Sequence, residues 1–77
     1  MKAKKIESEL KKLEPELKEI ARGMGTANFS KETGLKPPDI SAWVNGHRNF
    51  SYEKLIRIAL KISSRVLAYR KAHKDQN

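Results

Sequence analysis

The chain contains no cysteine among its 77 residues. This absence excludes a disulfide framework, a thiolate zinc site and a cysteine nucleophile, and it is consistent with an intracellular, cytoplasmic location. No apolar run approaches the roughly 18 residues that a membrane helix needs. The lysines at the start of the chain are followed by an amphipathic pattern rather than by the apolar core of a signal peptide. What remains is one small domain with a modest core, for which oligomerisation is a reasonable expectation.

Acidic residues are scarce relative to basic ones. Nine Asp and Glu stand against seventeen Lys and Arg, which gives a formal net charge of +8. The excess is uneven, because residues 51–77 carry seven basic and two acidic residues, whereas residues 1–22 carry seven and five. A basic balance favours polyanionic partners, chiefly nucleic acid or an anionic membrane surface.

Patterns typical of catalysis or metal binding are also missing. His47 and His73 are isolated, and neither has a carboxylate at metal-ligand spacing. The serines have no base nearby in sequence, and the glycines at positions 23 and 25 lack the lysine and the preceding strand of a phosphate loop. We therefore expect no enzyme activity, no cofactor, no metal ion and no small-molecule substrate.

No segment alternates apolar and polar residues as a strand does, so the sequence predicts an all-α bundle of about five helices. A heptad-like apolar stripe near the start comprises Ile6, Leu10, Leu13, Leu17, Ile20 and Met24. Pro15 falls inside this stripe, and proline disrupts a helix interior but suits a first turn. We predict a basic N-terminal helical extension over residues 1–14, with its helix at about 4–13, and a separate domain helix over 15–22. A single kinked helix is the alternative, and the first three stripe residues either extend the core or contact another subunit.

Residues 26–45 predict two short helices joined by a tight turn at Gly34, because glycine tolerates the positive φ that such a turn requires. Thr26 is the expected N-cap of the first helix, at about 27–33. Pro37 and Pro38 suit the start of the second helix, where amide hydrogens have no partner. The apolar face of that second helix comprises Ile40, Trp43 and Val44, which leaves Lys36, Ser41, Ala42 and Asn45 facing outward.

Two more helices are expected after a polar loop at residues 47–50. Ser51 is the expected N-cap of the first of them. Its apolar face comprises Leu55, Ile58, Ala59 and Ile62. The last helix is predicted at about 64–72, so that the main domain covers 15–72, and residues 73–77 are expected to form a disordered tail.

The two short helices resemble the helix-turn-helix of the Cro and phage-repressor family. The matching positions are Phe29, Ser30, Gly34, Leu35, Ile40 and Trp43. The resemblance continues through the following loop and helix and covers about residues 17–67. Ser30 stands where that family usually has alanine, and the two prolines stand where Ser, Thr or Gln is commoner.

The resemblance implies that the second short helix, at about 37–45, enters the major groove of duplex DNA. The contact positions that carry over from the family are Lys36, Pro37, Pro38, Ser41, Ala42 and Asn45. Thr26 can offer a hydroxyl or an amide to a phosphate. The loop residues His47, Arg48 and Asn49 are expected to form a second contact with the backbone.

Three functions follow from these patterns. The leading one is a phage or bacterial transcription regulator, either a repressor or a Cro-like or activator-like protein, that binds a duplex DNA operator as a homodimer or higher oligomer. The prolines at the reading positions motivate the second, a protein-interaction module such as an antitoxin or antirepressor. The third is a non-specific basic nucleic-acid binder, although the chain lacks the stacking aromatics that single-strand binders use. No membrane partner is expected.

Overall fold

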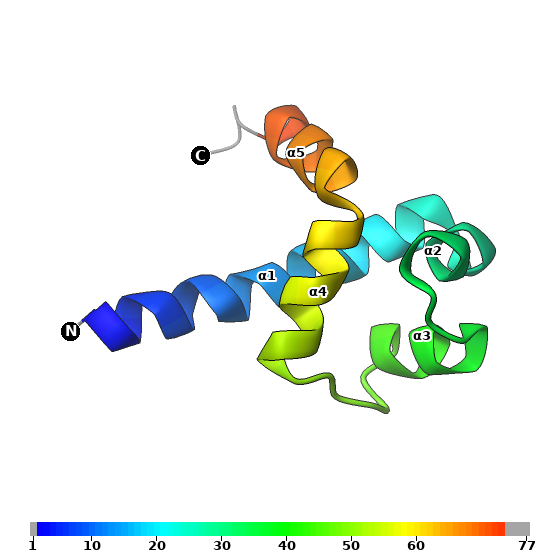
Figure 1. Cartoon of the computed structure of the whole chain (residues 1–77), viewed down its shortest axis with the longest axis horizontal. Helices are drawn as coiled ribbons and strands as arrows, with labels where there is room; N and C mark the ends of the chain where they lie inside the picture. Colours follow the sequence, from blue (N-terminus) through cyan, green and yellow to red (C-terminus); the bar gives the residue numbers. More distant parts are fainter. Residues whose placement is uncertain (1, 74–77) are drawn as a thin grey trace.

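The computed structural model describes the backbone of residues 2–73 and the side chains of residues 12–73. It contains five helices: α1 (Lys2–Met24), α2 (Thr26–Thr33), α3 (Pro37–Val44), α4 (Tyr52–Lys61) and α5 (Ser63–Ala72). Helix α1 is the longest, and the other four pack around its second half while its N-terminal turns project beyond them (Figure 1). No strand occurs in residues 2–73, which confirms the predicted all-α bundle.

The prediction of two separate helices around Pro15 is wrong, because α1 runs unbroken through this residue. A proline inside a helix costs about 3 kcal/mol. Leu17 and Ile20, in the turns that follow, are buried, and each such burial contributes about 1.5–3 kcal/mol. Packing therefore offsets the local cost of the proline. The boundary predicted between residues 14 and 15 lies inside this helix.

The apolar stripe of α1 continues into the core as far as the side chains are described. Leu13 is half-buried and packs against the core, as an extension of it. Ile6 and Leu10 lie outside the residues whose side chains are described, so their role in core or subunit contact stays a prediction.

Trp43 of α3 lies at the centre of the core and is fully buried. Its ring stacks between Phe29 of α2, with centroids 6.1 Å apart, and Phe50 of the loop before α4, at 4.9 Å. Its Nε1 donates a hydrogen bond to Glu14 of α1 at 3.1 Å, and the Lys18 ammonium lies 5.6 Å from the ring centroid. This one side chain therefore fixes the position of α3 against α1, α2 and the loop.

The rest of the buried apolar core comes from α1, α3, α4, α5 and the residue between α4 and α5. It comprises Leu17, Ile20, Ala21, Ile40, Leu55, Ile58, Ile62 and Val66.

The turn between α2 and α3 follows the predicted design. Gly34 has a φ of 79°, and its amide donates to the carbonyl oxygen of Ser30. The Ser30 hydroxyl donates to the carbonyl oxygen of Leu35 at 2.5 Å, which gives this serine a role that alanine could not fill. Pro37 and Pro38 occupy the first two positions of α3, as predicted.

The prediction of Thr26 as an N-cap is wrong. The N-cap of α2 is Gly25, and Thr26 is the first helical residue, whose side chain makes no capping hydrogen bond. Gly25 has a φ of 88°, so the chain can turn from α1 into α2 one residue earlier than the hydroxyl pattern indicated. Helix α1 accordingly continues to Met24, past the predicted end at residue 22.

Helices α4 and α5 meet at a single residue, Ile62. The Ser51 hydroxyl accepts a hydrogen bond from the amide of Lys54 at 3.2 Å, which confirms Ser51 as the N-cap of α4. Helix α5 begins at Ser63, one residue before its predicted start. The predicted tail begins at His73, which caps α5, and residues 74–77 lie outside the described part of the chain.

Helix α5 is attached mainly by polar contacts, because Val66 is its only buried side chain and all of α5 is described. Arg65 pairs with Glu32 of α2 at 2.7 Å, and Arg70 pairs with Glu16 of α1 at 2.9 Å. The Tyr69 hydroxyl donates to Glu19 of α1. The pairing of Glu32 with Arg65 makes the attachment of α5 dependent on pH.

The Arg65 guanidinium lowers the pKa of the Glu32 carboxyl, first by its hydrogen bond and then by its charge. A carboxyl with a lowered pKa stabilises the fold above its unfolded pKa, and this contribution is lost as pH falls through the folded pKa. We therefore predict that Glu32→Gln melts at a lower temperature than the wild type at pH 7, and that the difference disappears at pH 3. Glu53→Gln, which removes a carboxylate of α4, is the control. The same pH dependence in both variants would contradict a role for the contact with Arg65.

Candidate nucleic-acid interface

The outward face of α3 carries the side chains that the sequence predicted there. Lys36, Pro38, Ser41 and Asn45 are exposed, and Ala42 is half-buried. Pro37, at the first position of the helix, is also exposed. The Asn45 side-chain nitrogen lies 3.5 Å from the Ser41 hydroxyl oxygen, at the limit of a hydrogen bond, so these two polar groups meet on one face. They are one helical turn apart.

A hollow of about 250 Å³ joins this face to the neighbouring helix ends. Thr26 at the start of α2 lines it together with Ser41 and Asn45. Arg22, in the last turn of α1, lines it too and donates a hydrogen bond to the carbonyl oxygen of Val44 at 3.3 Å. The Arg22 guanidinium therefore lies beside the C-terminal end of α3, where it donates to a carbonyl oxygen that has no partner within the helix.

Arg22 was not among the candidate site residues predicted from the sequence. Its position in the last turn of a helix was predictable, but its contact with the end of α3 was not, because that contact joins distant parts of the chain. That proximity depends on the glycine turn at Gly25, which brings α2 and α3 back over the end of α1.

The loop after α3 contributes a second cation. The Arg48 guanidinium lies 3.5 Å from the carboxylate of Asp39 in the first turn of α3, and their side chains are 50% and 34% exposed. Asp39 would repel a phosphate, so the ion pair offsets a negative charge in the first turn of α3. His47 and Asn49 are exposed, and the His47 amide donates to the carbonyl oxygen of Ala42 at 2.7 Å, which closes the helix end.

Each carboxylate whose side chain is described has a polar or charged partner. These residues are Glu14, Glu16, Glu19, Glu32, Asp39 and Glu53. By contrast, the ammonium groups of Lys12, Lys31, Lys36 and Lys71 have no hydrogen-bond or ion-pair partner among residues 12–73. Of these four lysines only Lys36 adjoins α3, so the N-terminal end of α3 carries a positive charge that no carboxylate neutralises.

No group of three or more residues with metal-binding side chains comes together in residues 12–73. None of the five described helices combines the length and the apolar character needed to cross a membrane.

No family model, curated protein or solved structure matches this chain. The function is therefore inferred from the geometry and charge of the residues around α3.

Proposed function

We propose that this protein is a sequence-specific transcription regulator that binds duplex DNA and places α3 in the major groove. The observation that carries the proposal is the exposed face of α3, where Ser41 and Asn45 meet and cations flank both ends of the helix. A helix of this size fits the major groove, where each base pair presents a distinct pattern of donors and acceptors.

The proposed contacts fall into two classes. Ser41 and Asn45 offer hydroxyl and amide groups to base edges, and the Asn45 amide can form two hydrogen bonds with one adenine. Pro38 and Ala42 can make only apolar contacts, for example with a thymine methyl group. With few hydrogen-bonding side chains on α3, the shape of the DNA contributes to specificity.

Phosphate contacts position the helix. Lys36 at the start of α3, Arg22 beside its end and Arg48 in the loop are placed to bind the backbone on either side of the groove. The exposed side chains of His47 and Asn49 extend this loop contact. Thr26 adds a hydroxyl and a free first-turn amide at the start of α2, a position suited to a phosphate.

The proposed regulator acts as a homodimer. Tyr52, Ile56 and Leu60 follow one another at four-residue intervals along α4 and are 43%, 42% and 70% exposed. Apolar stripes of this kind on small domains mark interaction surfaces, and a symmetric pair would bury two of them at once. A second copy would also present a second α3 to a symmetric operator in the cytoplasm.

A protein-interaction module is the second candidate, and the exposed prolines of α3 favour it. Pro37 and Pro38 offer no amide or side-chain donor in the turn where base readers usually lie. Such a module would show no preference among duplex sequences.

The affinity for duplex DNA is predicted to fall steeply with salt, because binding to phosphates releases condensed counterions. A dimer that makes 6–10 phosphate contacts would lose roughly 10³–10⁵ in affinity between 50 and 200 mM salt. Fluorescence anisotropy titrations of a preferred duplex and a scrambled duplex of equal length, at several salt concentrations, measure this dependence of affinity on salt. A flat response, or equal affinity for both duplexes, would contradict the specific-regulator proposal.

A further inference from the structure

Helix α4 carries three different faces along its length. Leu55, Ile58 and Ile62 point into the core. The apolar stripe described above lies on one flank. The opposite flank carries Lys54, Arg57 and Lys61, at positions i, i+3 and i+7, and we call these three residues the basic flank.

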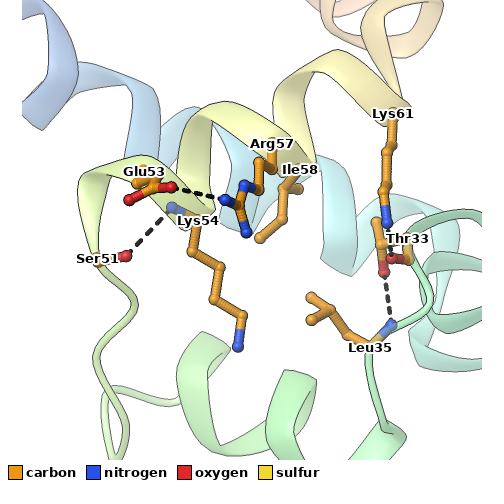
Figure 2. A pocket seen from close by; sticks show the side chains of 8 residues that line it. All are labelled: Thr33, Leu35, Ser51, Glu53, Lys54, Arg57, Ile58 and Lys61. Carbon is orange, nitrogen blue, oxygen red and sulfur yellow. Dashed lines mark hydrogen bonds and ion pairs between the residues drawn. The ribbon is translucent and has the colours of Figure 1, made fainter.

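The basic flank borders a hollow of about 370 Å³ between α4 and the turn that joins α2 to α3 (Figure 2). Thr33 and Leu35 form its other side. The Lys61 ammonium donates to the carbonyl oxygen of Thr33 at 3.0 Å. Lys54 extends from α4 toward α3, and its ammonium lies 4.4 Å from the ring centroid of Phe50. The hollow is therefore lined by three cations, none of which belongs to the DNA contacts proposed for α3.

The charge around this hollow is positive even after its ion pair is counted. Glu53 is the only carboxylate among the lining residues, all of which are described, and it pairs with Arg57 at 2.6 Å. The side chains of this pair are 71% and 75% exposed, so water and salt screen the pair strongly. A guanidinium has five N–H donors, so Arg57 keeps donors for a second anion.

The position of the hollow relates it to α3. Leu35 lines it, and the next residue, Lys36, begins α3 with an exposed ammonium group. The basic flank spans about 10 Å at 1.5 Å per helical residue. A DNA strand advances about 3.4 Å per phosphate along the duplex axis, so the flank has the length of about three phosphates.

We propose that the basic flank binds the phosphodiester backbone of the strand that Lys36 also contacts, and so extends the DNA interface from α3 onto α4. This inference rests on the proposed function. Lys54 acts as a point charge, while Arg57 can hold two oxygens of one phosphate. Lys61 closes the far end of the surface. The contacts carry no sequence information, so they strengthen binding to every duplex and fix the position of α3 in the groove.

The test compares two double variants of equal net charge. Lys54→Gln with Arg57→Gln removes two cations from the flank, and Lys12→Gln with Lys71→Gln removes two cations from α1 and α5. Lys61 is left intact because it contacts the end of α2. For each protomer bound, we expect the flank variant to lose roughly 60-fold in affinity for target and random duplexes at 0.1 M salt, and its salt slope to fall by about two, so that both losses are larger for the dimer. The control variant should lose only a few-fold, with an unchanged slope.

Two further variants separate a DNA contact from a folding defect. Lys54→Gln also removes the contact with Phe50, so thermal melts accompany each measurement. Arg57→Gln alone loses only the exposed contact with Glu53 and should reduce the salt slope by about one. Glu53→Gln should strengthen binding, because it removes the carboxylate that competes for Arg57.

The outcomes distinguish this inference from the proposed function. If the wild type prefers one duplex sequence but the two double variants lose the same affinity, the flank contributes only general charge and the inference is overturned. If the wild type binds every duplex equally while the flank variant loses more than the control, the flank contacts DNA and the specific-regulator proposal fails. If the wild type binds no duplex, both are overturned.

Discussion

Trp43→Ala is expected to destabilise the domain by about 3–5 kcal/mol, the usual cost of removing a buried aromatic side chain. The loss removes the ring that stacks between Phe29 and Phe50 and leaves Glu14 without its hydrogen-bond donor. A domain of this length has a free energy of unfolding of about 4–12 kcal/mol, so the variant would lose between about a quarter of its stability and all of it. Urea unfolding followed by circular dichroism measures the change.

Two further variants show which part of this loss comes from the buried ring. Trp43→Phe keeps an aromatic ring but cannot donate to Glu14, so it should cost less than the alanine variant, at about 1–3 kcal/mol. Leu67→Ala, at a side chain that is 67% exposed, should change stability by less than about 0.5 kcal/mol. An unchanged unfolding curve for Trp43→Ala would show that this residue is not at the centre of the core.

Substitutions on and around α3 are expected to separate base reading from phosphate binding. Ser41→Ala or Asn45→Ala should cost roughly 1–3 kcal/mol on the preferred duplex and leave binding to random DNA nearly unchanged. Lys36→Ala or Arg48→Ala should weaken binding to every duplex and reduce the salt slope by about one per phosphate contact. Anisotropy titrations on both duplexes at several salt concentrations distinguish the two patterns.

The structure refines the expectation for Arg48. Its removal also leaves the carboxylate of Asp39 without its ion-pair partner in the first turn of α3. We therefore expect Arg48→Ala to lose more affinity than Lys36→Ala, and Asp39→Asn to recover part of that loss. Because Asn45 is the C-cap of α3, thermal melts must accompany Asn45→Ala. Equal losses on target and random DNA for all four alanine variants would mean that α3 does not read bases.

Local chemistry made much of the fold predictable. Some residues strongly favour one position relative to a helix, and the structure has them there as predicted. They are Gly34 in the turn after α2, the two prolines at the start of α3, and Ser51 as the N-cap of α4. The predictions were wrong where the local preference of a residue competes with the burial of its neighbours in the core. Pro15 favours a helix break locally, but the burial of Leu17 and Ile20 in the turns that follow keeps α1 continuous.

The candidate site was predictable only in part for the same reason. Spacing along α3 predicted the outward positions of Ser41 and Asn45, because a helical repeat fixes them once Ile40 and Trp43 are buried. Nothing in the spacing could bring Arg22 to the end of α3 or Arg48 to Asp39, since these contacts join segments that only the folded chain places together. The expectation of DNA binding itself stays a prediction.

Selection of bound duplexes from a random DNA pool at physiological salt tests the central claim most directly. The proposed function predicts enrichment of a symmetric site whose half-sites are about 10–10.5 base pairs apart, which would report a dimer with one α3 in each half-site. Equal retention of all sequences, or no retained duplex, would contradict it.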